Sequence, residues 1–380
     1  MTSASWSKQD YAYMAEAIGL ARNGLYTTEP NPRVGCVIVN DDAVVGRGWH
    51  QKAGEGHAEV NALKEAGAKA KNATVYVSLE PCSHFGRTPP CAQALIEAGV
   101  SRVIAAMQDP NPSVSGRGFE ILRAAGIESE SGLLEAQARD LNPGFIKRMT
   151  QHRPWVRIKM ALSVDGRTAM ASGESQWITG PAARSDVQRL RARSSAVLTG
   201  AGTVLQDDAA LTVRADQLGL ENAELVAERQ PLRVVLDTNA RIGEQARLFA
   251  QPGPILWVVS EQAQIPEAIV CLQNVELVRL PDGNDHERLK LVLEMLAARD
   301  CNELLVEAGA SLAGSFLQQG DWDELVIYMA PILMGSDARA LANLPLQSMS
   351  ELKNLELKDI RMVGNDIRMI YHPVVSRQEI

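Results

Sequence analysis

Short apolar runs rich in Val, Ile and Leu alternate with helical patterns along almost the whole chain. In the first half, RVGCVIVN, ATVYVSLE and RVIAAMQD are strand-like, and HAEVNALKEAG and CAQALIEAG between them have helical spacing. In the second half, AVLTGAG, LRVVLDT, ILWVVS, VELVRL and ELLVEAG continue this alternation. Strands that alternate with helices of this length are typical of layered sheets with helices on their faces. The sequence therefore predicts an α/β fold class in both halves.

The alternation is interrupted between the two halves by the segment NPGFIKRMTQHRP. Its residues Pro143, Gly144 and Pro154, together with several basic residues, are typical of a linker. A chain of 380 residues is also longer than one domain usually is. We therefore expect two domains, at residues 1–147 and 154–375. In the second half, the polar stretch DQLGLENAELVAERQ is interpreted as a surface insertion.

Composition restricts the classes of function. The net charge of −8 and the aromatic content of 4% do not suit nucleic-acid binding, which needs a basic face or aromatic stacking platforms, so we expect no nucleic-acid partner. No apolar run reaches the length of about 18 residues that a membrane helix needs, so we expect no membrane partner. The N-terminal stretch lacks the pattern of a signal peptide, and the five cysteines are an odd number. We therefore expect a cytoplasmic protein without disulfides.

The most specific chemical pattern is a His-Ala-Glu triplet at residues 57–59, followed by Pro-Cys at residues 81–82 and by Cys91. Zinc binds imidazole nitrogen and thiolate sulfur, and a catalytic zinc site has three protein ligands with water in the fourth position. Zinc deaminases have the signature His-x-Glu followed by Pro-Cys-x-x-Cys. The first part matches, but eight residues separate the two cysteines here instead of two. We predict that His57, Cys82 and Cys91 bind Zn²⁺, one ion per deaminase domain.

Glu59 is the expected catalytic residue of this site. It follows the first ligand by two positions, so it can face the water without binding the metal. Zinc lowers the pKa of its bound water, and a general acid/base then moves the water proton to the leaving amine. Two alternatives are a structural zinc site with His84 as the fourth ligand, and buried inert cysteines. Neither alternative gives Glu59 a role.

Several segments around this pattern, HAEV, PCSHFGRTPPC, NPRVGCVIV and GRGWHQKAGEGHAE, resemble the deaminase domain of the bifunctional riboflavin-biosynthesis deaminase/reductases. The resemblance implies a cytidine-deaminase-like three-layer α/β domain that acts on a diaminopyrimidinone ribotide. It also implies that this substrate is contacted by Asn31, His50, His84 and Arg87. Arg87 suits the phosphate, because a guanidinium pairs well with phosphate oxygens.

Two glycine-containing turns follow strands in the second half, in VLTGAGTVLQDD and in LLVEAGASLAGSF. Such glycines let backbone N–H groups approach a phosphate at a helix start. Both turns lack the last glycine of the Rossmann motif Gly-x-Gly-x-x-Gly, and either alone could be only a tight turn. Together with KMALSVDGRTA, SQWITG and LTVR, they resemble the reductase domain of the same family. That domain has a dihydrofolate-reductase-like α/β fold and uses NADPH.

The resemblance implies two sets of residues in the second domain. The NADPH site would be lined by Ala161, Trp177, Thr203, Asp207, Thr238, Gly309, Ala310, Ser311, Leu312, Ala313, Gly314 and Ser315. The substrate would be bound by Ser175, Arg191, Leu211, Arg214 and Glu307, with the two arginines on its phosphate. Lys159 is a candidate for protonating the opening sugar, and the alternative is a lysine that only extends along its strand.

The sequence therefore predicts a bifunctional enzyme, both a hydrolase and an oxidoreductase. The first domain would deaminate 2,5-diamino-6-ribosylamino-4(3H)-pyrimidinone 5′-phosphate. The second would reduce the ribosyl group to ribityl with NADPH, giving 5-amino-6-ribitylamino-uracil 5′-phosphate. Pyrimidine ribotides are the expected small-molecule partners, and a homo-oligomer is the expected assembly. The competing hypotheses are a zinc deaminase that acts on nucleic acid through an appended binding domain, and a zinc-stapled binding module without catalysis.

Overall fold

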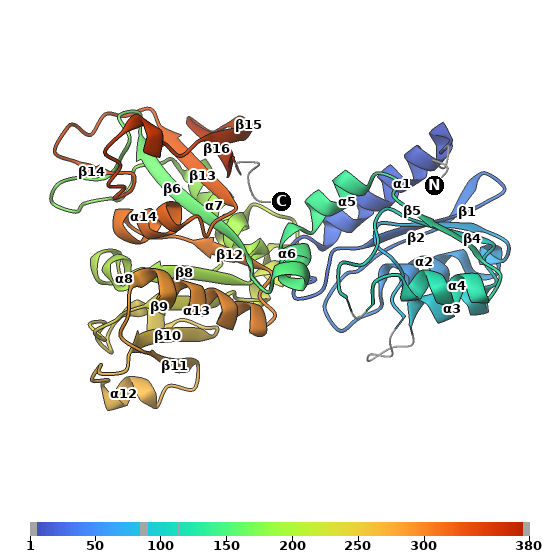
Figure 1. The fold of residues 1–380 in the computed structure, drawn as a ribbon, viewed down its shortest axis with the longest axis horizontal. Helices are drawn as coiled ribbons and strands as arrows, with labels where there is room; N and C mark the ends of the chain where they lie inside the picture. The colour runs from blue at the N-terminus through green and yellow to red at the C-terminus, as the bar shows by residue number, and fades with distance from the viewer. Residues whose placement is uncertain (1–5, 84–89, 113, 375–380) are drawn as a thin grey trace. The chain divides into compact units, whose positions relative to one another are not determined.

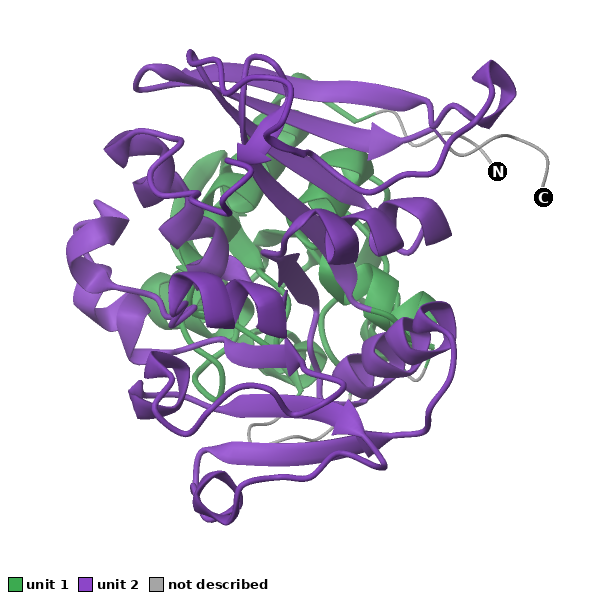
Figure 2. Cartoon of the chain, turned by 90° about the vertical axis from the view of Figure 1, so that its left-hand side faces the viewer, with its two compact units in different colours: residues 1–153 green, residues 154–380 purple. Residues whose placement is uncertain are grey.

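The computed structural model describes residues 6–83, 90–112 and 114–374. The chain forms two compact units, residues 1–153 (unit 1) and residues 154–380 (unit 2), shown in Figure 2. Each unit has its own main sheet and its own apolar cores. None of the helices in the described residues is long and apolar enough to cross a membrane.

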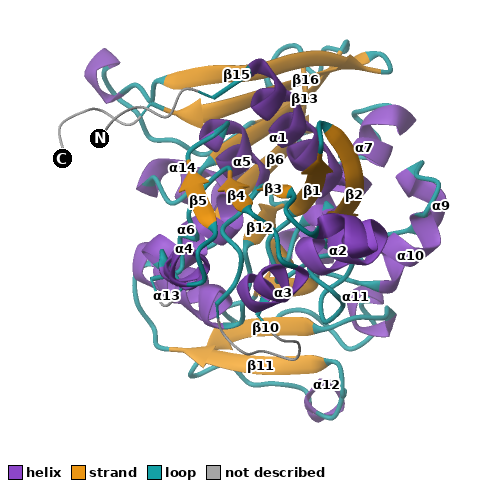
Figure 3. Cartoon of the chain, turned by 90° about the vertical axis from the view of Figure 1, so that its right-hand side faces the viewer, coloured by secondary structure: helices purple, strands orange, loops and turns teal. Residues whose placement is uncertain are grey.

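Unit 1 is an α/β sandwich of three layers. Its elements in chain order are α1 (Lys8–Ala21), β1 (Gly35–Asn40), β2 (Ala43–Trp49), α2 (Ala58–Ala66), β3 (Thr74–Val77), α3 (Cys91–Ala98), β4 (Arg102–Ala105), α4 (Arg117–Ala124), β5 (Glu128–Ser131), α5 (Glu135–Leu141) and α6 (Pro143–Gln151). The sheet has the order β2-β1-β3-β4-β5, with β1 antiparallel to its neighbours and β3, β4 and β5 parallel. Helices α1 and α5 cover one face, and α2, α3 and α4 cover the other (Figures 1 and 3).

Both faces of this sheet are buried, as the strand β1 shows. Because side chains alternate between the faces of a strand, Cys36 and Ile38 pack under α2 and α3, while Val37 and Val39 pack under α1. A strand that is buried on both faces has a continuous apolar run instead of alternating polar residues. This accounts for the sequence GCVIVN in β1.

The segment that the sequence predicts as a linker is helical instead. Helix α6 begins at Pro143, in the first helical position, where proline loses no hydrogen bond and already has a helical φ. Asn142 anchors the start of the helix: its Oδ1 accepts the backbone N–H of Arg33 at 2.8 Å, and its Nδ2 donates to the carbonyl oxygen of Arg33 at 2.9 Å. The linker prediction is therefore wrong for residues 143–151, because a proline can start a helix as well as end one.

Unit 2 is a larger α/β unit. Its elements are β6 (Trp155–Ser163), β7 (Arg167–Ala169), α7 (Pro181–Arg193), β8 (Ala196–Gly200), α8 (Ala201–Asp207), α9 (Ala215–Leu218), α10 (Ala223–Glu228), β9 (Leu232–Leu236), α11 (Arg247–Ala250), β10 (Ile255–Ser260), α12 (Glu267–Val270), β11 (Val275–Leu280), α13 (Asp285–Ala298), β12 (Glu303–Val306), α14 (Ala310–Gln319), β13 (Glu324–Ala330), β14 (Arg339–Ala340), β15 (Leu355–Val363) and β16 (Asp366–Pro373). Strands β7 and β14 form a small separate sheet.

The main sheet of unit 2 has nine strands in the order β11-β10-β9-β8-β12-β6-β13-β16-β15. The strands from β11 to β13 are parallel, and β16 and β15 are antiparallel to their neighbours. The carboxyl ends of the parallel strands therefore meet along one edge of the sheet. In open α/β sheets this edge is where ligands bind.

The polar stretch after Arg214 lies mostly at the surface of unit 2 but has regular structure. It forms the short helices α9 and α10, in which the side chains of Leu218 and Val226 are buried. Two residues of α7 hold α9 in place, because Ser185 Oγ donates to the carbonyl oxygen of Gln217 at 2.6 Å and Arg189 Nη1 donates to that of Leu218 at 3.0 Å. The hydrogen bonds from α7 and one buried apolar side chain in each short helix thus hold this surface stretch in place, and its interpretation as an insertion stays a prediction.

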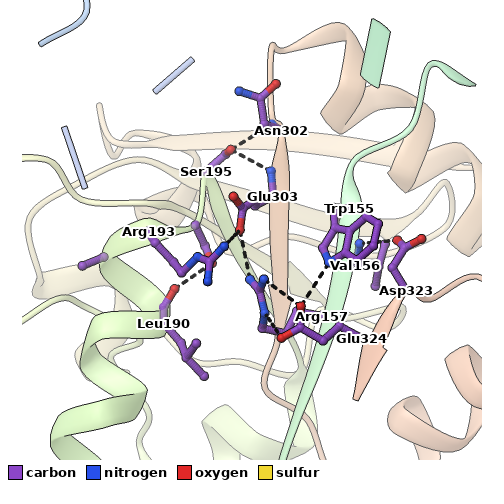
Figure 4. A network of polar contacts seen from close by, with 12 residues as sticks. Trp155, Val156, Arg157, Leu190, Arg193, Ser195, Asn302, Glu303, Asp323 and Glu324 are labelled. Carbon is purple, nitrogen blue, oxygen red and sulfur yellow. Dashed lines mark hydrogen bonds and ion pairs between the residues drawn. The ribbon is translucent and has the colours of Figure 1, made fainter. Parts of the chain in front are cut away.

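A buried network of charges joins the amino ends of three neighbouring strands in unit 2 (Figure 4). Arg157 of β6 lies between two carboxylates: its Nη1 is 3.1 Å from Oε2 of Glu303 at the start of β12, and its Nε is 2.8 Å from Oε1 of Glu324 at the start of β13. Arg193 Nη2 contacts Glu303 Oε2 at 3.0 Å. The side chains of Arg157 and Glu303 are each 1% exposed, so these charges stabilise the unit only as an intact network.

Candidate active sites

The residues predicted as zinc ligands lie together in unit 1. His57 Nδ1 is 3.5 Å from Cys82 Sγ and 3.3 Å from Cys91 Sγ, and the three donor atoms all lie within 4.8 Å of one another. In a tetrahedral zinc site, bond lengths of about 2.0 Å to nitrogen and 2.3 Å to sulfur separate the two atoms by about 3.5 Å. Both the donor types and their spacing therefore fit a zinc ion.

Two helix starts position these donors. His57 directly precedes α2 in extended backbone, and Cys91 is the first residue of α3. The backbone N–H of Cys91 donates to Cys82 Sγ at 3.2 Å. Hydrogen bonding by the side chains of Cys91 and His57 lowers the pKa of the Cys82 thiol to about 4. A thiolate, which is the form that binds a metal, is thus favoured at this position.

Close packing of α2 on β2 fixes the first ligand in place. A Cβ atom at Gly48 would lie 2.2 Å from the carbonyl oxygen of Ala58 and 2.4 Å from the backbone nitrogen of Ala62. Any side chain at position 48 would therefore push α2 away from the strand. Because His57 and Glu59 lie at the start of this helix, the absence of a side chain at Gly48 determines where both of them lie.

Glu59 is buried beside the donor cluster and is not one of its three members. Burial and the charge of Cys82 raise the pKa of its carboxyl group to about 7, and the thiol of Cys91 hydrogen-bonds it. The carboxyl group therefore lies beside the three donors, where it would face a water bound to the metal that they hold. This is the position that a general acid/base needs.

Asn31 and His50 form a pair next to the ligand His57. His50 Nδ1 faces the carbonyl oxygen of Gly56 at 3.2 Å, so this nitrogen donates, and His50 Nε2 accepts from Asn31 Nδ2 at 3.0 Å. Burial lowers the pKa of His50, which favours the neutral ring that this pairing requires. The rings of His50 and His57 meet edge to face, with 5.4 Å between their centres. The other two predicted substrate residues, His84 and Arg87, lie outside the described residues.

A buried carboxylate that the motif does not include, Glu80, lies two positions before Cys82. It is 3% exposed. Its Oε2 accepts the backbone N–H groups of Asp109 at 3.1 Å and Gly116 at 3.0 Å, and its Oε1 accepts that of Gly118 at 2.9 Å. Helix α4 has no side-chain cap from Gly116, the residue before its first turn. Glu80 therefore caps α4 from another part of the chain.

This cap joins the metal-binding turn to α4. A Cβ atom at Gly118 would lie 2.2 Å from the carbonyl oxygen of Pro81, so the first turn of α4 lies directly on the residue between Glu80 and Cys82. The sequence does give one signal for this role. Glu80 ends the mostly apolar run ATVYVSLE that includes β3, where burial is expected, and a buried carboxylate needs a specific partner.

Most of the residues predicted for the second site line a cavity of about 1060 Å³ in unit 2. All the predicted substrate residues line it, namely Lys159, Ser175, Arg191, Leu211, Arg214 and Glu307. The predicted cofactor residues that line it are Ala161, Trp177, Thr203, Asp207, Thr238, Gly309, Ala310, Ser311, Leu312 and Ser315. The remaining two lie elsewhere: Ala313 is buried in the core, and Gly314 packs against the backbone of Asn343.

A buried ion pair lies at the polar end of this cavity. Arg191 Nε and Nη2 donate to the two carboxylate oxygens of Glu307 at 2.5 and 3.0 Å, and Arg191 Nη1 donates to the carbonyl oxygen of Thr212 at 3.1 Å. Burial raises the pKa of Glu307, but the nearby charge and hydrogen bonds of Arg191 outweigh this effect and hold the pKa below its ordinary value. The carboxylate of Glu307 therefore stays charged. Burial lowers the pKa of Lys159, with Glu307 acting in the opposite direction. Lys159, Glu307 and Arg191 thus form one charged group in the cavity wall.

Other predicted residues form the mouth of the cavity. The side chain of Trp177 is 67% exposed, and the guanidinium of Arg184 lies over its ring at 4.7 Å. Ser175 Oγ donates to Asp207 Oδ1 at 3.1 Å, which ties the segment before Trp177 to the end of α8. Helix α14 begins at the cavity after Gly309 and has no side-chain cap. Its first N–H groups are therefore available to a phosphate.

Known families match both units. The RibD C-terminal domain matches residues 154–369, and the cytidine and deoxycytidylate deaminase zinc-binding region matches residues 7–107. The riboflavin biosynthesis protein RibD of Escherichia coli (strain K12) is 51% identical over 363 residues, which are 94% of this chain and 98% of that protein. The chain belongs to the RibD family.

Solved structures agree with this assignment. Form 1 of Acinetobacter baumannii RibD aligns with a TM-score of 0.90 at 46% identity, covering 97% of this chain and 99% of that one. A deaminase/reductase from Thermotoga maritima, diaminohydroxyphosphoribosylaminopyrimidine deaminase/5-amino-6-(5-phosphoribosylamino)uracil reductase, aligns with a TM-score of 0.83 at 33% identity, covering 96% of this chain and 99% of that one.

These findings confirm the resemblance, the fold class and the two activities. The chain is a bifunctional enzyme of riboflavin biosynthesis with a zinc-binding deaminase unit and a reductase unit, and its reductase chemistry needs a nicotinamide cofactor. The donor set of His57, Cys82 and Cys91 fits the zinc ion that the first family describes. The hypothesis of a nucleic-acid deaminase is not favoured, and small-molecule substrates are consistent with the family.

Proposed function

We propose that unit 1 deaminates 2,5-diamino-6-ribosylamino-4(3H)-pyrimidinone 5′-phosphate and that unit 2 reduces the ribosyl group of the product to ribityl, with NADPH as the cofactor. The product would be 5-amino-6-ribitylamino-uracil 5′-phosphate. We assign the first step to residues 1–147 and the second to residues 154–375. The observation that carries the proposal is the buried Glu59 beside the donors of His57, Cys82 and Cys91. The activities in the name of the Thermotoga maritima relative support the choice of substrates.

In unit 1, His57, Cys82 and Cys91 would hold the zinc ion, which supplies a water nucleophile at neutral pH. Glu59 would take the proton from that water as the oxygen bonds to the ring carbon. It would then pass the proton to the amino nitrogen, so that ammonia leaves when the carbon–nitrogen bond breaks. The Asn31–His50 pair would bind the pyrimidine edge, and His84 and Arg87 would bind the rest of the ribotide.

In unit 2, NADPH would supply the hydride that reduces C1′ of the opened sugar. Lys159 would donate a proton to the opening sugar, since its amine lies in the cavity wall and Glu307 favours its charged form. Because Arg191 is held by Glu307, Arg214 would make the more direct contact with the substrate phosphate. The first turn of α14 would bind the cofactor pyrophosphate, and Trp177 would cover the cofactor.

A coupled assay tests both steps. We expect wild-type enzyme to oxidise NADPH when the diaminopyrimidinone ribotide is added, because the reductase can use only the deaminated product. Glu59→Gln should abolish this oxidation, and deaminated ribotide should restore it. Glu65→Gln is the matched control, since Glu65 lies on the same helix but is exposed and should not affect either step. If wild-type enzyme oxidised no NADPH even with deaminated ribotide, the assignment of unit 2 would be wrong.

We also propose that the enzyme is a homo-oligomer in which a second copy covers strand β15, the edge of the unit 2 sheet. A β-bulge between Leu357 and Asp359 brings Leu355, Leu357, Ile360 and Met362 to the same side of this strand, and their side chains are 39–63% exposed. An exposed apolar edge strand is normally covered. Light scattering after size-exclusion chromatography should give at least a dimer, and Ile360→Lys with Met362→Lys should give a monomer.

A further inference from the structure

The reductase cavity has an apolar end over the carboxyl ends of β9, β10 and β11. These strands lie on one side of β8 and β12, whereas Lys159 and Ala161 come from β6 on the other side. The floor of this end consists of the strand residues Leu236, Val258 and Leu280 and of Leu289 and Val292 from α13. An apolar floor beside the pyrophosphate-binding turn suits a flat base such as adenine.

Two arginines line the cavity at this apolar end. Arg241 follows β9, and Arg288 lies in the first turns of α13, whose apolar side forms part of the floor. Arg241 forms one ion pair within the described ranges, from its Nε to Asp237 Oδ1 at 3.7 Å. In the same ranges Arg288 forms no ion pair, and neither guanidinium donates a hydrogen bond. Both therefore have N–H groups that can bind an anionic ligand.

A third arginine of the cavity, Arg247, belongs to the substrate end. It lies close enough to Arg214 for its charge to help lower the pKa of that residue, after the larger effect of burial. Arg214 in turn lies near enough to Glu307 for that carboxylate to oppose part of this lowering of the pKa. Among the arginines that line the cavity, Arg191, Arg214 and Arg247 thus lie at the substrate end, and Arg241 and Arg288 lie at the adenine end.

The acidic residue that could favour NADH at this end, Asp237, is buried and does not line the cavity. In many NAD-binding α/β folds, an acidic side chain near a strand end accepts the ribose 2′-OH, and an arginine in its place accommodates the 2′-phosphate of NADP. Asp237 directly follows β9, but its side chain is fully buried. Its Oδ2 accepts the backbone N–H of Ile242 at 3.0 Å, and Arg241 lies on its Oδ1 side. The surface presented to a cofactor here is that of the arginines.

We propose that Arg241 and Arg288 bind the 2′-phosphate of NADPH and select it over NADH, with the adenine on the apolar floor between them and α14. The inference rests on the proposed function in requiring a nicotinamide cofactor in this cavity. A guanidinium forms strong, often paired hydrogen bonds with phosphate oxygens, and the 2′-hydroxyl of NADH offers no such charge. The two arginines thus add affinity only for the phosphorylated cofactor.

Equilibrium binding of NADPH and NADH by calorimetry, without substrate, tests this directly. Hydrogen bonds to charged groups make a difference of about 10- to 100-fold in affinity, so Arg241→Gln and Arg288→Gln should each raise the Kd for NADPH by about that factor. The Kd for NADH should change less than about twofold, which also shows that the cavity is intact. Lys290→Gln is the matched control, since it removes the same charge from α13 at a position that does not line the cavity.

The double variant separates the outcomes. We expect Arg241→Gln with Arg288→Gln to bind the two cofactors about equally, and 2′,5′-ADP to lose its advantage over 5′-ADP in the same measurement. A double variant that still prefers NADPH as strongly as the wild-type enzyme would overturn the assignment of the arginines. Equal affinities for both cofactors in the wild-type enzyme would overturn it too. Failure of the wild-type enzyme to bind either cofactor would instead contradict the proposed function of unit 2.

Discussion

Replacing Glu80 with glutamine tests whether this buried carboxylate positions the metal-binding turn. Its two oxygens accept three backbone N–H groups, two on Oε2 and one on Oε1. If the glutamine carbonyl takes the place of Oε2, its amide group faces the N–H of Gly118, and a donor meets a donor. One hydrogen bond to a charged group is lost and one buried N–H is left without an acceptor, which together cost about 2–4 kcal/mol.

Part of this cost should appear at the metal. The residue after Glu80 packs against the start of α4, and the next residue is the ligand Cys82. Groups that orient metal ligands typically change metal affinity by about 10- to 100-fold, so we expect the Kd for zinc, measured by competition with a chelator, to rise by that factor in Glu80→Gln. Deaminase kcat should fall at saturating substrate, while reduction of supplied deaminated ribotide should be unchanged.

Asp10→Asn is the matched control. Asp10 is also a buried carboxylate at a helix start in unit 1, where it accepts from Ser7 and from Tyr76, but α1 covers the other face of the sheet. This variant should lose stability and keep its zinc affinity. The positioning role of Glu80 is refuted if Glu80→Gln unfolds more easily but binds zinc with the wild-type Kd and keeps its deaminase kcat. Glu80 would then only stabilise the fold.

Three further outcomes follow from the structure. Removing zinc with a chelator should stop deamination but leave reduction of deaminated ribotide intact, as followed by NADPH oxidation, because the cavity of unit 2 contains none of the metal donors. The pKa of Lys159 is lowered by burial, raised by Glu307 and lowered by Arg191, and the net direction is downward. With the ammonium of Lys159 as the acid, reductase kcat should therefore fall as the pH rises, at a pH below the ordinary lysine pKa of about 10.4. Lys159→Arg should move this fall to higher pH. Arg157→Met should lower the free energy of unfolding of unit 2 in urea by about 3–5 kcal/mol, because Glu324 and Glu303 each lose a buried contact with this arginine, although Glu303 keeps its contact with Arg193. Arg299→Met should have little effect, because its ion pair with Glu276 is at the surface.

The metal donors could be found from sequence because their chemistry restricts the residue types and keeps them at recognisable positions. A His-x-Glu triplet and a Pro-Cys pair remain visible although they come from different elements. Glu80 could not be found in this way, since its partners are backbone N–H groups, which every residue except proline provides. Arg241 and Arg288 were equally hidden, because the cavity joins them from a loop and a helix that no motif connects.

Two segments show how tertiary contacts can decide a structure that local composition does not indicate. Proline and glycine at residues 143–144 indicate a break, yet Asn142 ties this position to Arg33 and a helix begins there. The stretch after Arg214 is polar, yet α9 is held by hydrogen bonds from α7 to its carbonyl groups. In both cases, contacts with residues far away in the sequence decide the structure, and the segment itself contains little sign of them.

The positions of the metal donors have a consequence for how this enzyme family can diversify. Because His57 and Cys91 lie at the starts of two helices and Cys82 is held through Glu80 and α4, each donor is fixed by a part of the scaffold outside the stretch between the two cysteines. That stretch can therefore change in length and composition without changing the metal geometry. The two-residue spacing of the general zinc deaminase signature and the eight-residue spacing here can thus support the same hydrolytic chemistry.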